Sequence, residues 1–257
     1  MPIKNYSQIT HVGLVRENNE DAILCNARLG LWLVADGMGG HAAGEVASAI
    51  AKKVIEQQVS KGKPISAAIN SAHQAVLQAA QDGEGKYGMG STVVALKSNA
   101  KEMEVAWVGD SRAYLWTDNS LQPLTVDHSY VQMLYQSGLI SAEEMISHPE
   151  KNVITQCLGS TELDALKVDT IVHRWRPADW VLLCSDGLTD GVNDQEICNI
   201  LHLQTTPESA VKALLQAALD KGGKDNVSII IVAQPKGIGE KISAKWKAFT
   251  QKSGTTA

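Results

Sequence analysis

Aspartate follows an apolar segment at three separate places in the sequence. The three are Asp36 in LWLVADG, Asp110 in VAWVGDS and Asp186 in VLLCSDG. A glycine or a serine comes directly after each aspartate, and such residues allow the backbone to turn sharply. Because short apolar segments of this kind are typical of buried strands, we expect three strands to bring three carboxylates to one place. Such a cluster would bind a hard cation.

Two further acidic segments strengthen this expectation. Glu20 and Asp21 follow Asn19, and Asp225 precedes Asn226. Two carboxylates about 4 Å apart repel each other by roughly 4 kcal/mol at an effective dielectric constant of 20, so a larger cluster needs protons or cations. Oxygen ligands without cysteine or clustered histidine favour magnesium, manganese or calcium over zinc. An aspartate shared by two such ions would form a hydrolytic two-metal centre.

The acid–glycine pairs also fit two different roles. Asp-Gly is the commonest signal of a tight hairpin turn, so each pair by itself is more typical of a turn than of a ligand. Residues 37–42, GMGGHA, also fit the GxGxxA pattern of a dinucleotide-binding turn. Against this, a second helix follows where a strand ending in an acid is needed, and Asp36 would repel a pyrophosphate. The sequence has no GxxxxGK[ST] motif, no GxSxG motif and no cysteine followed six positions later by arginine.

The composition limits the classes of partner. The chain has 257 residues and a net charge of −5, and the lysine-rich segment 235–257 contributes +4, which leaves −9 on residues 1–234. An acidic body with one phenylalanine argues against nucleic acid as a partner. The longest apolar runs are about five residues, and the first ten residues lack the apolar core of a signal peptide. We therefore expect a cytoplasmic protein with no transmembrane segment and reduced cysteines.

Hydrophobic periodicity predicts the elements that must position the acids. We expect strands at residues 8–12, 22–26, 31–35, 92–96, 104–108, 112–116, 121–124, 169–174, 180–184 and 227–233. We expect helices at residues 43–58, 65–81, 194–203 and 207–221, the last with an N-terminal cap of Thr205 and Glu208. Short turns between strands favour antiparallel pairing, so the pattern predicts an α+β fold in which helices cover two sheets. Residues 128–160 carry two short helices, at 129–137 and 141–147, and are interpreted as an inserted flap.

Seven segments in order resemble the bacterial form of the metal-dependent serine/threonine protein phosphatases of type 2C. They are GLVRENNEDA (13–22), VADGMGGHAAGE (34–45), GMGSTVV (88–94), VGDSRAY (108–114), LTVDHS (124–129), CSDGLTD (184–190) and GKDNVSIII (223–231). The resemblance implies a four-layer α-β-β-α sandwich of two mainly antiparallel sheets flanked by helix pairs. It implies one phosphatase domain over residues 1–234, and we interpret residues 235–257 as a flexible tail or a short amphipathic helix.

The resemblance also implies a ligand set for two Mn²⁺ or Mg²⁺ ions and a third ion. Asp36 would bridge the two catalytic metals, and the Gly37 carbonyl would bind one of them. Asp186 and Asp225 would hold the other, and Asp110 with Asp186 the third. Glu20 or Asp21 would serve the metal at Gly37, directly or through water.

Two further residues take catalytic roles by resemblance. Arg16 would grip the phosphate, for which a guanidinium is well suited because its donors form a fork. His41 would either protonate the leaving oxygen or order a metal-bound water, and the alternatives are equally weighted. We expect His128 to fix a loop.

The implied activity is hydrolysis of phosphoserine and phosphothreonine on proteins, opposing a bacterial serine/threonine kinase. We expect a monomer. Two alternatives stay open: a phosphohydrolase for small phosphomonoesters, and a catalytically silent relative that binds a partner.

Overall fold

Two five-stranded sheets form the centre of the protein, seen in a computed structural model that describes residues 5–39, 43–99, 101–161 and 165–234. The strands lie in the order β1-β12-β11-β8-β9 in one sheet and β10-β7-β6-β3-β2 in the other, and neighbouring strands pair in antiparallel fashion. The strands are β1 (Tyr6–His11), β2 (Ala22–Asn26), β3 (Leu31–Ala35), β6 (Val93–Ser98), β7 (Glu102–Val108), β8 (Arg112–Thr117), β9 (Ser120–Pro123), β10 (Asp169–Arg174), β11 (Trp180–Cys184) and β12 (Val227–Ala233).

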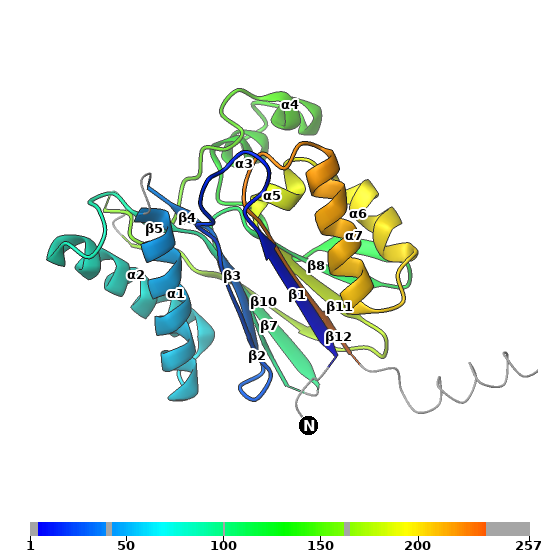
Figure 1. Cartoon of the computed structure of the whole chain (residues 1–257), viewed down its shortest axis with the longest axis horizontal. Helices are drawn as coiled ribbons and strands as arrows, with labels where there is room; N and C mark the ends of the chain where they lie inside the picture. Colours follow the sequence, from blue (N-terminus) through cyan, green and yellow to red (C-terminus); the bar gives the residue numbers. More distant parts are fainter. Residues whose placement is uncertain (1–4, 40–42, 100, 162–164, 235–257) are drawn as a thin grey trace, which may run out of the picture.

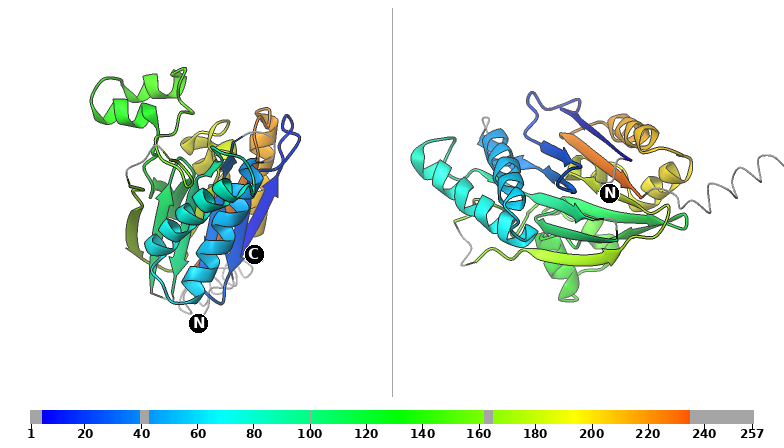
Figure 2. Two further views of the ribbon diagram at one scale, coloured as in Figure 1. Left: turned by 90° about the vertical axis from the view of Figure 1, so that its left-hand side faces the viewer. Right: turned by 90° about the horizontal axis from the view of Figure 1, so that it is seen from below.

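Helices cover the outer face of each sheet (Figures 1 and 2). Helices α1 (Ala43–Ser60) and α2 (Ile65–Asp82) pack on the sheet that contains β3, and α6 (Asp194–His202) and α7 (Pro207–Asp220) pack on the sheet that contains β12. The four-layer α-β-β-α architecture expected from the sequence is therefore confirmed.

Strand β3 shows why the central strands are apolar on both faces. All five of its residues are buried. Leu31, Leu33 and Ala35 contact the layer of α1 and α2, whereas Trp32 and Val34 belong to the core between the two sheets. A sheet covered on both faces needs continuous apolar strands, and β12 (VSIIIVA) is buried in the same way.

Most predicted elements agree with the structure to within two residues at each end. The N-terminal cap of α7 is a correction, because the side chain of Thr206, not Thr205, accepts a hydrogen bond from the Ser209 amide. Proline at the first helical position places the cap on the residue directly before Pro207. The short elements β4 (Gly37–Met38), β5 (Gly90–Ser91) and α5 (Asp186–Thr189) were not predicted, since they are too short to show a periodicity.

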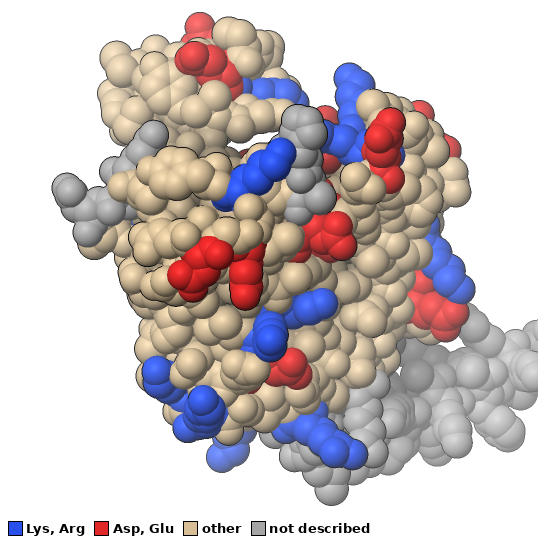
Figure 3. Space-filling view, turned by 60° about the vertical axis from the view of Figure 1, so that its left-hand side comes forward, with Lys and Arg blue, Asp and Glu red and all other residues tan. Residues whose placement is uncertain are grey.

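The flap carries α3 (Tyr130–Gln136) and α4 (Ala142–Ser147) and stands above the sandwich in Figure 1. No residue of α4 is buried. In Figure 3 the flap forms a lobe at the top, with a hollow beneath it, and charges of both signs are interspersed over the face drawn there. The predicted tail, residues 235–257, lies outside the described residues. None of the helices described in this structure has the length and apolar character needed to cross a membrane.

Candidate active site

The predicted acids meet at the end of the sandwich below the flap. Asp36 follows β3, Asp110 lies in the turn between β7 and β8, and Asp186 begins α5 one residue after the end of β11. These three line one cavity of about 310 Å³ together with Glu20 and Asp225. Carboxylates that are far apart in the sequence are therefore brought together.

Gly37 lines the same cavity and is held in a close approach of three chain segments. Its amide donates to the Glu20 carbonyl over 3.2 Å. A Cβ atom at position 37 would lie 2.1 Å from the Gly44 carbonyl oxygen and 2.6 Å from the Glu20 carbonyl oxygen. Only glycine fits there, and this accounts for the glycine after Asp36 better than a turn does. Thr92 fixes the preceding residue, since its amide donates to the Asp36 carbonyl and its hydroxyl accepts from the Asp36 amide.

Burial and mutual repulsion raise the pKa of four of these acids. The pKa of Asp36 lies well above its ordinary value because of burial, and then because of Asp21, Asp186 and Asp110. Burial first and neighbouring carboxylates second raise the pKa of Asp110 to about 8 and that of Asp186 to about 6. Burial raises the pKa of Asp21 to about 7 against hydrogen bonds from Ser228 and Ser185.

These residues fit a centre for hard divalent cations. Asp21 Oδ1 and Asp186 Oδ1 are buried and receive no hydrogen bond from a nitrogen or hydroxyl donor of the described residues. Buried anionic oxygens without a partner are costly, and a cation would satisfy them. In the described part of the chain, no group of three acidic, histidine or cysteine side chains has the mutual spacing that would hold a metal ion without rearrangement. Burial and then repulsion from Asp21, Asp186 and Asp110 raise the pKa of Asp36, and a divalent ion in the cavity would offset that repulsion.

Arg16 lies at the mouth of the cavity. Its Nη2 atom contacts Asp225 Oδ2 at 2.8 Å, and its side chain is 54% exposed. This ion pair raises the pKa of the guanidinium further. Because exposed pairs contribute little to stability, Arg16 can exchange this contact for a phosphate.

Asn226 is a positioning residue that the sequence alone did not single out. Its Oδ1 accepts from the Glu20 amide, and its Nδ2 donates to the carbonyl oxygens of Val12 and Asn18. The side chain is buried, and these bonds tie the loop that carries Arg16 and Glu20 to the start of β12. The available signal was an asparagine directly before a strand and directly after an acid.

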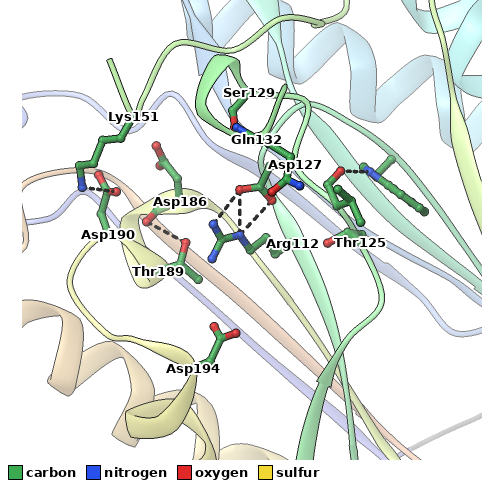
Figure 4. Close-up of polar contacts among 12 residues, drawn as sticks. Arg112, Thr125, Asp127, Ser129, Gln132, Lys151, Asp186, Thr189, Asp190 and Asp194 are labelled. Atoms are coloured by element: carbon green, nitrogen blue, oxygen red, sulfur yellow. Dashed lines mark hydrogen bonds and ion pairs between the residues drawn. The ribbon is translucent and has the colours of Figure 1, made fainter. Parts of the chain in front are cut away.

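Further side chains hold the acids from behind. The Ser185 hydroxyl donates to Asp21 Oδ2 over 2.9 Å, and this places Asp21 under the cavity wall rather than in its lining. Arg112, two residues after Asp110, forms a partly buried ion pair with Asp127, which Figure 4 shows.

His128 holds the turn that carries Asp110, through Gly109. The His128 amide donates to the Gly109 carbonyl, and the Nδ1 atom of its ring accepts from the Gly109 amide. The ring is buried. The prediction that His128 fixes a loop is confirmed.

The structure thus brings together seven of the nine predicted site residues. Glu20, Asp36, Gly37, Asp110, Asp186, Asp225 and Arg16 line one cavity, and Asp21 lies directly behind it. His41 lies outside the described residues, so its role stays a prediction. No disulfide bond joins any two of the four cysteines within the described residues.

Known proteins share both the sequence pattern and the fold. The model of the family protein phosphatase 2C matches residues 15–223. The serine/threonine protein phosphatase PstP of Mycobacterium tuberculosis is 35% identical over 236 residues, which cover 89% of this chain and 45% of that protein. The chain therefore spans about half the length of PstP. The serine/threonine phosphatase stp of Listeria welshimeri is 34% identical over 236 residues, covering 87% of this chain and 93% of that protein.

Solved structures agree. The crystal structure of the Mycobacterium tuberculosis phosphatase PstP/Ppp has a TM-score of 0.84 and 33% identity, over 92% of this chain and 100% of that one. The PstP catalytic domain in complex with two manganese ions has a TM-score of 0.80 and 31% identity, over 91% of this chain and 99% of that one. With its sequence and its fold matched over nearly the whole described length, this chain belongs to the protein phosphatase 2C family.

Proposed function

We propose that this protein hydrolyses phosphoserine and phosphothreonine on proteins, using two Mn²⁺ or Mg²⁺ ions held by the acidic cavity. The observation that carries the proposal is the convergence of carboxylates with raised pKa values around one cavity, with an arginine at its mouth. The family of the chain supports it, because its relatives PstP and stp are serine/threonine phosphatases.

Each acid takes the role that its position suggests. Asp36 would hold both ions, the Gly37 carbonyl one of them, and Asp186 with Asp225 the other. Glu20 lines the cavity and is better placed than Asp21 to act directly on the ion at Gly37. Asp21 lies behind the lining and would act through water. Asp110 with Asp186 would bind a third ion.

The bound ions would supply an activated water and offset the charge that develops on the phosphoryl group. Arg16 binds two phosphoryl oxygens with its forked donors and so aligns phosphorus over the cavity. Asn226 keeps the Arg16 loop in register with Asp225. His41 would protonate the leaving seryl or threonyl oxygen or order a water molecule. In the cell, the protein would act as a cytoplasmic monomer that opposes a serine/threonine kinase.

The decisive test is hydrolysis of matched phosphopeptides. Peptides with phosphoserine, phosphothreonine or phosphotyrosine in one sequence are incubated with the protein in Mn²⁺ and in EDTA, beside p-nitrophenyl phosphate. We expect Mn²⁺-dependent release of phosphate from the first two peptides and a loss of about a thousandfold or more in Asp36→Asn. Asp118→Asn, the same change at an exposed turn, serves as the control.

The remaining outcomes separate the alternatives. Hydrolysis of p-nitrophenyl phosphate without hydrolysis of any peptide would show a phosphohydrolase for small molecules. Absence of all hydrolysis, with Mn²⁺ still raising the melting temperature, would show a silent relative.

A further inference from the structure

A second cavity lies beside the acidic one and differs from it in charge. It has a volume of about 310 Å³ and shares Arg16, Asn152 and Asp225 with its neighbour. Its lining contains four cationic side chains against two carboxylates, those of Asp190 and Asp225. The cationic residues are Arg16, Lys151, Lys221 and Lys224. A cavity with a net positive lining therefore opens next to the place where we expect the scissile phosphate.

The lysines reach this cavity from two sides. Lys151 comes from the flap, and Figure 4 shows it reaching Asp190 beside Asp186. Lys221 caps the C-terminus of α7, and Lys224 follows in the turn that ends at Asp225.

Two glycines shape the turn that carries Lys224. Gly222 and Gly223 have φ values of 113° and 48°, and the Gly223 carbonyl accepts from the Leu14 amide. Leu14 belongs to the loop that carries Arg16. The turn is therefore fixed to that loop, and Lys224 is held close to the phosphate-binding arginine.

The lysines are available to an incoming anion. Lys151 contacts Asp190 at 3.1 Å, and Lys221 contacts Glu196 at 2.7 Å. The side chains of both lysines and of both acidic partners are at least 36% exposed. Exposed pairs of this kind contribute little, so a ligand can replace them. Lys224 is exposed, and none of the ion pairs within the described residues involves it.

We propose that this basic cavity, defined by Lys151, Lys221 and Lys224, binds a second anionic group of the phosphoprotein substrate. The group is a carboxylate or a phosphoryl group on a residue close in sequence to the scissile phosphoserine or phosphothreonine. Two arguments carry it. The cationic lining attracts anions. The basic cavity shares Arg16, Asn152 and Asp225 with the acidic one, so a residue next to the scissile one can reach it. The inference rests on the proposed function and specifies its substrate class.

The test uses the full chain with Mn²⁺ and a series of phosphothreonine peptides. The parent peptide has alanine at the three positions before and the three positions after the phosphothreonine. In each further peptide, one of these alanines is replaced by glutamate or by phosphoserine. Loss of phosphate from the threonine is followed by mass spectrometry, because the phosphoserine is itself a proposed substrate. For that reaction we expect at least one position at which glutamate raises kcat/KM by about 3- to 5-fold, and phosphoserine by about 10-fold because it carries more charge. A larger gain from phosphoserine than from glutamate identifies a phosphoryl group as the preferred ligand, and equal gains identify any anion.

Variants locate the preference. The ratio of kcat/KM between the anionic and the alanine peptide is measured in Lys151→Ala, Lys224→Ala and the double variant, so that a general loss of activity cancels. We expect the ratio to fall toward one in the double variant and in the wild type at 1 M salt, where charges are screened beyond about 3 Å. Lys212→Ala, at an exposed lysine of α7 outside the cavity, should keep the wild-type ratio.

The two proposals fail in different ways. If all peptides are hydrolysed at equal rates whatever their neighbours, the basic cavity is not a subsite, and the proposed phosphatase activity stands. If the wild type prefers the anionic peptide and the double variant keeps this preference, another surface binds the anionic residue and the inference is wrong. If no peptide is hydrolysed while p-nitrophenyl phosphate is, the proposed function itself fails. Circular dichroism of each lysine variant verifies folding. The comparison of anionic and alanine peptides in the wild-type protein tests the preference even if a variant does not fold.

Discussion

The acidic end of the sandwich and the flap above it are held in opposite ways. The acids lie at the ends of strands whose residues are largely buried, and backbone hydrogen bonds, Ser185 and Asn226 fix them. The flap helix α4 buries no residue, and ion and amide contacts from Lys151 and Asn152 to Asp190 link the flap to the body. The difference suggests that the chemistry is built into the core, whereas substrate selection depends on contacts that are weak and easily changed.

Among residues outside the proposed ligand set, the largest effect is expected from Asn226, which anchors the acidic end. Asn226→Ala leaves the Glu20 amide and the carbonyl oxygens of Val12 and Asn18 without their partner. We expect kcat/KM for p-nitrophenyl phosphate to fall by about 10- to 100-fold, as for other residues that orient metal ligands. The unfolding free energy should fall by about 1–3 kcal/mol. Asn70→Ala, an exposed asparagine on α2, is the control, and wild-type activity in Asn226→Ala would contradict the role.

The next effect concerns the cavity mouth. Arg16→Ala removes the guanidinium that we propose binds the phosphate and leaves the carboxylates in place, so KM for phosphopeptides should rise by about tenfold with a smaller change in kcat. Steady-state kinetics measures the two parameters separately. Arg174→Ala, at a largely exposed arginine of β10, should leave both unchanged. A fall in kcat at constant KM would assign Arg16 a different role.

Without metal, the stability of the protein should depend on pH because of its buried acids. Asp186, Asp21 and Asp110 have pKa values near 6, 7 and 8 in the folded protein, above the ordinary value of 3.8. Their contribution to stability is therefore fully present below about pH 4 and is lost as pH rises through those values. In EDTA, the melting temperature should fall by about 5 °C or more between pH 5 and 8.5. Saturating Mn²⁺ should reduce this slope, and an identical slope with and without Mn²⁺ would contradict a metal site here.

The smallest effect is expected at the flap. Asp190→Asn removes the charge that Lys151 contacts, so the flap should open more often. Amide hydrogen exchange of residues 130–153 should accelerate by about 2- to 5-fold, since an exposed ion pair contributes under about 1 kcal/mol. Asp82→Asn on α2 is the control. Unchanged exchange would mean that other contacts hold the flap.

The same contrast explains what could be predicted from the sequence. The strands 22–26 and 31–35 were predicted with correct bounds because their apolar segments are bounded by polar residues and by turns. Asp36, Asp110 and Asp186 were identified because each follows such a strand. Strand bounds can be predicted from residue types and their order, because a buried strand requires apolar residues and its ends require polar residues or turns.

What could not be predicted depends on contacts between distant segments. Asn226 bonds to residues about 206 to 214 positions away, and nothing local to it reveals those partners. The pairing of β4 with β5 joins two-residue strands, which have no period. The basic cavity requires the flap and the turn after α7 to meet, so three scattered lysines gave no signal in the sequence.

The turn from Gly222 to Asp225 has an evolutionary consequence. It carries Lys224 and Asp225 as consecutive residues, one facing the basic cavity and the other shared by both cavities. A mutation that shifts this turn would alter target choice and turnover together, and selection would then oppose it. Lys151 lies in the flap, which is separate from this turn, so substitutions there can change substrate specificity while the acidic cavity is preserved.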